Sequence, residues 1–148
     1  MPPPTPVLTP DEINRYLDDV FPELNATRRA YVVTDVGEGT AVVTCAAGPE
    51  SLRPGGTVSG PTLMTLADIA AWVVILAHVG RSALTVTTHL SIDFLRKPEP
   101  GLLFGRARLM KLGKRLAVSS VEIGDADGRA PYAIASATYS IPPPLERG

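Results

Sequence analysis

Hydrophobic and polar residues follow different patterns along the chain, and the first of these predicts a helix followed by a hairpin. Residues 9–21 carry apolar side chains at helical spacing, after a threonine and a proline suited to a helix start: Ile13, Leu17, Val20 and Phe21. Residues 28–36 and 40–47 are rich in β-branched side chains, and Gly37-Glu38-Gly39 joins them. We therefore expect a short helix and then a β-hairpin.

The longest apolar run lies at residues 63–77 and is interrupted only by Thr65 and Asp68. It follows a loop rich in glycine and proline at residues 48–56. A helix that is apolar on all sides belongs in a core, and this one is too short, and interrupted by an acid, to be a convincing membrane span. The run therefore predicts one long buried helix.

Everything after that helix is predicted to be strand. Residues 84–95 alternate, with one side made of Leu84, Val86, Leu90, Ile92 and Phe94 and the other of Thr85, Thr87, His89, Ser91 and Asp93. Three further strands are expected at residues 102–112, 115–124 and 132–141. Because about six strands accompany one apolar helix, the expected fold class is α+β, an antiparallel sheet wrapped around a long central helix, with a short N-terminal helix.

Composition indicates one ordinary domain. The chain has 148 residues, and we expect a single domain at residues 9–141 between two disordered proline-rich tails, residues 1–8 and 142–148. A net charge of -1 offers no basic patch for nucleic acid and no polybasic membrane anchor. Cys45 is the only cysteine, so no disulfide framework or thiol metal cluster is expected. The first residues lack the features of a signal peptide, which favours a cytoplasmic location.

The acid in the apolar helix is the first candidate for chemistry, because an ionised carboxylate loses its hydration shell on burial. Helical spacing places Asp68 within an apolar collar formed by Met64, Thr65, Ala71, Trp72 and Ile75. Such surroundings tune an acid for general-base catalysis. The alternative is a buried acid that hydrogen-bonds backbone groups or a partner subunit.

Two stretches of the chain form a combined motif. Gly56-Thr57-Val58-Ser59-Gly60-Pro61 precedes Leu66-Ala67-Asp68, and the later strand reads Thr87 to Arg96 and then Lys97-Pro98. Gly101 at a strand start and a turn at Gly113-Lys114 complete the pattern. Over residues 30 to 141 the chain resembles the hotdog-fold thioesterases of the phenylacetate-pathway (PaaI-like) type.

The resemblance implies a hotdog monomer in a homo-oligomer, a dimer or a dimer of dimers, with active sites at subunit contacts. It also implies hydrolysis of acyl-CoA thioesters without a metal or other cofactor. Asp68 is then the nucleophile or the base that activates water, and the N–H of Gly60 is the oxyanion donor. Thr87 matches a hydroxyl that places the attacking water from the opposing subunit. Because Thr87 falls on the polar side of its strand, this role requires a bulge, and Thr88 is the next candidate.

Three residues depart from the family pattern near this site. Ser59 stands where the family has histidine, and Pro61, which has no N–H, replaces a second glycine. Both residues suit a helix start. Arg53 stands where the family often has asparagine or glutamine. These departures indicate an altered active site, in which Ser59 and Pro61 contact or shape the substrate.

The remaining substrate-binding candidates flank this motif. Met64 and Trp72 are expected beside Asp68, where Trp72 either lines the acyl pocket or packs in the core. Arg96, Lys97 and Lys114 lie at strand ends, where they either meet the phosphates of coenzyme A or are solvated turn charges.

The histidines argue against one related activity. His78 is ten residues from Asp68, about 15 Å along a helix, and His89 is predicted to lie on the surface. A hotdog hydratase, which needs a histidine beside its acid, is therefore disfavoured. The predicted function is an acyl-CoA thioesterase. Two alternatives stay open: a non-catalytic acyl-CoA-binding protein, and a structural hotdog domain whose Asp68 serves only the dimer contact.

Overall fold

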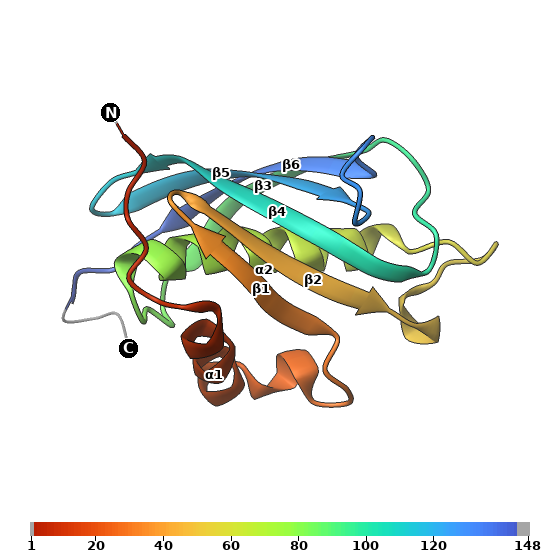
Figure 1. Cartoon of the computed structure of the whole chain (residues 1–148), viewed down its shortest axis with the longest axis horizontal. Helices are drawn as coiled ribbons and strands as arrows, with labels where there is room; N and C mark the ends of the chain where they lie inside the picture. The colour runs from red at the N-terminus through yellow and green to blue at the C-terminus, as the bar shows by residue number, and fades with distance from the viewer. Residues whose placement is uncertain (1, 145–148) are drawn as a thin grey trace.

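The computed structural model of the protein describes residues 2–144 and contains two α-helices and six strands (Figure 1). In chain order these are α1 (Pro10–Val20), β1 (Tyr31–Gly37), β2 (Thr40–Ala47), α2 (Gly60–Val79), β3 (Val86–Phe94), β4 (Gly101–Leu112), β5 (Leu116–Gly124) and β6 (Ala133–Ser140). Two short 3-10 helices, η1 (Pro22–Asn25) and η2 (Pro49–Ser51), fall in segments for which the sequence predicted no regular structure. The predicted order of helix, hairpin, long helix and four strands is confirmed.

The strands form one antiparallel sheet in the order β1-β2-β4-β5-β6-β3. Figure 1 shows the sheet curving over α2, with α1 below the β1 end. This confirms the α+β fold class and the arrangement of a sheet around one long helix. The order leaves β1 and β3 as the two edge strands.

Helix α2 begins three residues before the predicted run because Ser59 and Pro61 supply its start. The Ser59 side chain accepts a hydrogen bond from the N–H of Thr62, and Pro61 occupies the first turn, where no N–H is needed. The helix ends at Gly80, whose φ of 96° lies in the region that favours glycine. By length and hydropathy α2 would pass as a membrane span, but 72% of its apolar window is buried in the fold, as expected for a core helix.

Small residues allow α2 to lie close against the sheet. A Cβ added at Gly105 on β4 would approach Leu66 to 3.2 Å and Ala70 to 3.3 Å. Leu66 and Ala70 are fully buried. The glycine therefore sets the spacing between the middle of α2 and the sheet.

The N-terminal segment packs against the end of α2. The N–H groups of Val7 and Leu8 both donate to the carbonyl of Ala77, and the Leu8 side chain is buried. The sequence predicted a disordered tail over residues 1–8, whereas the structure places this part of it on the helix. Residue 1 and residues 145–148, at the far ends of the two predicted tails, lie outside the described residues.

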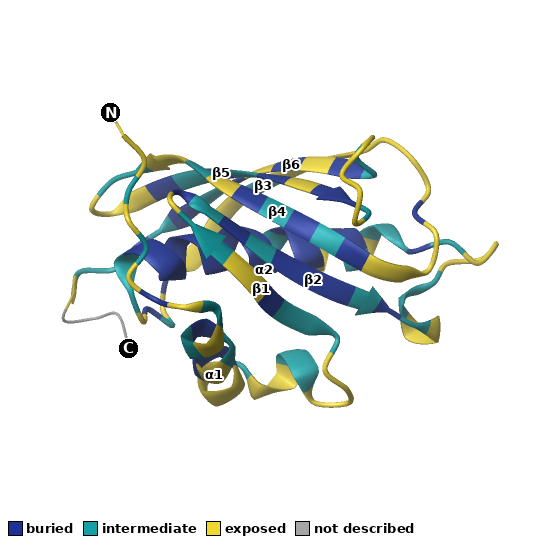
Figure 2. Cartoon of the chain, in the orientation of Figure 1, coloured by how far each residue is buried: buried dark blue, intermediate teal, exposed yellow. Residues whose placement is uncertain are grey.

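Strand β3 is the more exposed edge of the sheet. Val86 and Phe94 at its two ends are 52% and 50% exposed, and most of its other residues are also exposed. Figure 2 shows buried residues along the middle strands and α2, and in the strands they alternate with more exposed positions. An exposed edge with apolar side chains is a surface suited to pairing with another strand.

Candidate active site

Asp68 lies on the side of α2 that faces β3 and β6, and its carboxylate has two hydroxyl partners. The Thr87 hydroxyl donates to Oδ1 at 2.6 Å, and the Tyr139 hydroxyl donates to the same oxygen at 2.5 Å. The Tyr139 oxygen also lies 2.7 Å from the backbone carbonyl of Asp68. Asp68 is half-buried, so one carboxylate oxygen is held while the group still borders open space.

The local sheet geometry explains how both hydroxyls reach the helix. Thr87 on β3 pairs with Tyr139 on β6, and the register between these strands shifts between Thr87 and His89. Thr88 is the extra residue of this bulge, so Thr87 turns from the polar side of the strand toward Asp68. The predicted bulge is therefore present. The contact lies within one chain, however, whereas the resemblance implied that this hydroxyl acts from the opposing subunit.

Tyr139 is buried, and burial raises the pKa of its hydroxyl above the ordinary 10.0; the negative charge of Asp68 adds to the effect. The hydroxyl is therefore protonated at neutral pH and acts as a donor. The sequence reasoning missed Tyr139. The available signal was a large polar aromatic residue in a strand whose other side chains, apart from Ile134, are small.

A pocket of about 250 Å³ lies beside Asp68, Thr87 and Tyr139. Its other lining residues are mostly apolar and come from α1, α2 and the segment before β3: Val20, Phe21, Ile69, Trp72, Ala83 and Thr85. The Phe21 and Trp72 rings lie 6.4 Å apart in a tilted arrangement. Trp72 thus lines this pocket as well as packing in the core.

The predicted apolar collar around Asp68 is only partly present. Ala71 and Ile75 are buried in the core, and Trp72 is nearly so. Met64 is 42% exposed and Thr65 is also exposed. The immediate partners of the carboxylate are hydroxyl groups, which sequence spacing within the helix cannot reveal.

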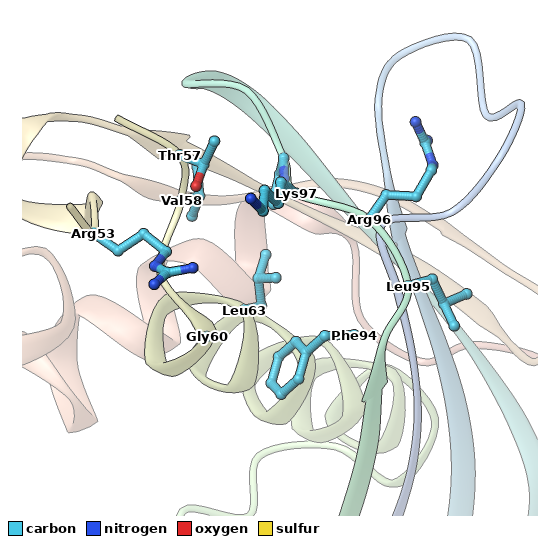
Figure 3. A pocket seen from close by; sticks show the side chains of 10 residues that line it. Arg53, Thr57, Val58, Gly60, Leu63, Phe94, Leu95, Arg96 and Lys97 are labelled. Carbon is cyan, nitrogen blue, oxygen red and sulfur yellow. The ribbon is translucent and has the colours of Figure 1, made fainter. Parts of the chain in front are cut away.

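A second pocket, of about 380 Å³, lies at the start of α2 and includes Gly60 (Figure 3). Its lining combines apolar side chains with three cations: Arg53, Thr57, Val58, Leu63, Phe94, Leu95, Arg96, Lys97 and Pro98. Gly60 carries one of the first N–H groups of α2, which have no partner inside the helix. A Cβ at Gly60 would lie 3.5 Å from the Phe94 ring, so the helix start borders the end of β3.

The two pockets are separate within one chain. Gly60 and Asp68 are eight residues apart on the same helix, about 12 Å by the standard rise. One carbonyl group cannot contact both residues of the same chain. The predicted oxyanion donor and the predicted acid are therefore not brought together in a single protomer.

The other predicted substrate residues divide between the two ends of the molecule. Lys97 and Arg96 both line the pocket at Gly60, but the Arg96 guanidinium donates to the Ala130 carbonyl and lies over the Tyr132 ring. Lys114 follows β4, about 40 Å along the strand from Gly101 beside that pocket. Thr88 donates to the Thr138 carbonyl instead of turning toward Asp68.

The two histidines do not contact Asp68. His78 is buried, where its Nδ1–H donates to the Val74 carbonyl and its Nε2 accepts from the N–H of Gly39. His89 is exposed on β3. Among residues 2–144, no group of three or more histidine, cysteine, aspartate or glutamate side chains is placed to hold a metal ion.

Comparisons with known proteins agree on one family. The family model of the thioesterase superfamily matches residues 55–132. A crystal structure of a candidate thioesterase from Silicibacter sp. TM1040 is 41% identical, with a TM-score of 0.83 over 93% of this chain and 94% of that one. A phenylacetic acid degradation-related candidate thioesterase from Ralstonia eutropha JMP134 is 27% identical, with a TM-score of 0.74 over 85% of this chain and 98% of that one. A candidate esterase of Saccharolobus solfataricus is 28% identical over 124 residues, 84% of each chain.

Proposed function

Because the chain belongs to the thioesterase superfamily and has the hotdog fold of its PaaI-like members, we propose that it hydrolyses acyl-CoA thioesters with Asp68 as nucleophile or base. The family match supports a thioesterase activity. The identity of the substrate and the role of the acid are inferences from the site.

The observation that carries the proposal is the carboxylate of Asp68, held by two hydroxyls at the mouth of a partly aromatic pocket. A carboxylate fixed at one oxygen keeps its other oxygen oriented for attack or for accepting a proton. Thr87 and Tyr139 are positioning residues in this account. The pocket beside them is mostly apolar, so it suits an uncharged part of the substrate.

A second subunit supplies the missing oxyanion donor. The side of α2 left uncovered by the sheet carries the exposed residues Pro61, Met64 and Thr65, and the half-buried Asp68 lies at the border between this side and β3. If two copies pack these sides together antiparallel about a two-fold axis near Met64, Gly60 of one copy faces Asp68 of the other, because residue 64 lies midway between them. A two-fold interface makes two identical sites of this kind.

The exposed edge strand supports the same dimer. Strand β3 lies beside α2 and borders both pockets, through Thr87 at one end and Phe94 at the other. Pairing β3 with its copy covers the free edge and continues the sheet across the dimer. This arrangement agrees with the homo-oligomer expected from the sequence.

The reaction then needs only groups of the protein and water. The Gly60 N–H of one subunit donates to the thioester carbonyl oxygen, on which negative charge develops. Asp68 of the partner attacks the carbonyl carbon, or removes a proton from the water that attacks it. The carbon–sulfur bond breaks, and coenzyme A leaves as the thiol after taking up a proton. If water attacked, the free acid is formed directly. If Asp68 attacked, a water hydrolyses the mixed anhydride between Asp68 and the acyl group, which releases the acid and restores the carboxylate.

A screen of short, long and aromatic acyl-CoAs, with Asp68→Asn and Asp93→Asn as a matched pair, tests this function. Asp93 is exposed on the outer side of β3 and carries the same charge. We expect Asp68→Asn to lower kcat/KM by about 100- to 10,000-fold, the usual contribution of a positioned acid or base, while Asp93→Asn changes little.

The alternative is a non-catalytic acyl-CoA-binding protein, which the replacement of the motif histidine by Ser59 favours. Coenzyme A thioesters that bind but are not hydrolysed by the parent protein would support that alternative. Equal hydrolysis by Asp68→Asn and the parent would remove Asp68 from the chemistry.

A further inference from the structure

The pocket at the start of α2 contains two cations without a protein partner. Within residues 2–144, neither the Arg53 guanidinium nor the Lys97 ammonium makes a hydrogen bond or an ion pair. Figure 3 shows both side chains extending toward the space above the first turn of α2, and Arg96 directed away from it. Arg96 is occupied by the Ala130 carbonyl and the Tyr132 ring, 4.7 Å away.

The rest of this pocket carries no compensating negative charge. None of its lining residues is an acid, and five of them are apolar: Val58, Leu63, Phe94, Leu95 and Pro98. Two unpaired cations in a pocket with an apolar lining fit a ligand with an anionic end and an apolar body. The ligand class is therefore an amphipathic anion.

The backbone around Arg53 is fixed by a tight turn. The Arg53 N–H donates to the Thr57 carbonyl at 2.8 Å, and the Gly56 N–H donates to the Arg53 carbonyl at 3.0 Å. Gly55 and Gly56 have φ values of 99° and 82°, which residues with a side chain rarely adopt. The planar guanidinium of Arg53 thus starts from a defined position, and its fork of donors matches a carboxylate in two parallel hydrogen bonds.

Resting on the proposed function, we propose that Arg53 and Lys97 bind a carboxylate on the acyl group, so that the preferred substrates are coenzyme A thioesters of dicarboxylic acids. The same pocket contains Gly60, the proposed donor to the thioester carbonyl. A charge bound there must lie only a few bonds from the thioester. The phosphates of coenzyme A lie beyond the whole pantetheine arm, which is longer than a pocket of about 380 Å³ is wide.

The test compares glutaryl-CoA with valeryl-CoA, whose acyl chains have the same number of carbons and differ in the terminal carboxylate. Both carry the same coenzyme A, so contacts to its phosphates cancel in the ratio of their kcat/KM values. The variants are Arg53→Gln, Lys97→Gln and, as a charge-matched control at the exposed far end of β4, Lys111→Gln. We expect the parent protein and Lys111→Gln to prefer glutaryl-CoA, and Arg53→Gln to lower that preference by about 10- to 100-fold, the effect of a charge-assisted hydrogen bond.

Two kinetic results would overturn the assignment. Equal losses on both substrates in Arg53→Gln and Lys97→Gln would mean that the cations contact coenzyme A phosphates. Unchanged kcat/KM values in both variants would mean that the two cations contact neither group.

Calorimetric binding of glutarate, with valerate and inorganic phosphate as comparisons, separates this proposal from the proposed function because it needs no hydrolysis. Glutarate binding lost in Arg53→Gln supports the anion site even in a protein without turnover, and no glutarate binding by the parent contradicts it.

Discussion

At the scale of single residues, the main feature of the proposed site is one carboxylate that accepts hydrogen bonds from two hydroxyl groups. Asp68 comes from α2, Thr87 from β3 and Tyr139 from β6, so three elements meet at one oxygen atom. This geometry explains how an ionised acid is tolerated in an apolar helix. The carboxylate has hydrogen-bond partners, and it borders a pocket instead of the sealed core.

The pKa of Tyr139 predicts how stability depends on alkaline pH. Burial, followed by the charge of Asp68, raises the pKa of this group above 10.0, its ordinary value in the unfolded chain. Below pH 10.0 Tyr139 is protonated in both the folded and the unfolded chain, so its contribution to the free energy of unfolding is fully present. Above pH 10.0 the unfolded chain loses this proton first, so the free energy of unfolding falls as the pH rises toward the pKa of the folded state. Tyr139→Phe removes this contribution, so the fall should be shallower by about 1.4 kcal/mol per pH unit.

Urea denaturation at several pH values on both sides of 10.0 measures that slope. The variant retains a second contribution from Tyr31, whose pKa burial also raises, so its slope should be smaller than that of the parent without vanishing. Identical slopes in Tyr139→Phe and the parent would show that Tyr139 titrates alike in both states.

At the scale of elements, different hydrogen bonds hold the two ends of α2 in place. Ser59 caps its start, while at its end Ala77 accepts from the N-terminal segment and His78 links the helix to the β1–β2 turn. The His78 ring accepts from the N–H of Gly39 and donates to Val74. His78 is therefore a structural residue.

Replacing His78 should weaken the link between α2 and the hairpin. His78→Leu leaves the buried N–H of Gly39 without an acceptor, and we expect a loss of about 1–3 kcal/mol in the free energy of unfolding. His89→Leu, at an exposed position of β3, is the control and should change stability by no more than about 0.5 kcal/mol. Equal effects of the two substitutions, measured by denaturant titration, would contradict this role.

The helices and strands could be predicted from the sequence because each has its own local pattern of apolar and polar residues. The apolar run predicted α2, alternation predicted β3, and the resemblance pointed to Asp68 and Gly60. What the sequence could not show was contact between distant segments. The Tyr139 hydroxyl contacts Asp68 from 71 residues away in the sequence, and the Arg96 guanidinium donates to a carbonyl on another loop. Neither contact follows from residue spacing along one helix or strand.

At the scale of the whole molecule, a single chain leaves the proposed chemistry incomplete. Gly60 and Asp68 line different pockets, while the side of α2 between them and the β3 edge stay uncovered. The proposed two-fold dimer through these surfaces would bring the two residues together and cover the exposed apolar side chains. Under this proposal the oligomer is part of the catalytic site.

A charge placed at the proposed axis should separate the subunits. Met64 is 42% exposed on α2, and Met64→Glu brings two carboxylates together across the axis, where like charges cost several kcal/mol. We expect a monomer at micromolar concentration by sedimentation, with at least a 10-fold loss of hydrolysis. Met110→Glu, at a 63% exposed position on β4, should leave the dimer intact. A stable Met64→Glu dimer with normal activity would place the interface elsewhere.

The most direct test of the shared site is the activity of a purified mixed dimer. One subunit carries Asp68→Asn and the other carries Gly60→Val, whose side chain would lie against Phe94 and take up space in the pocket that both residues line. Each variant alone should be nearly inactive. In the mixed dimer, the intact Gly60 of the first subunit faces the intact Asp68 of the second, so about half of the parental kcat should return, one working site of two. If the mixed dimer is as inactive as the two variants are alone, the account is contradicted, because Gly60 and Asp68 of each site would then belong to the same chain.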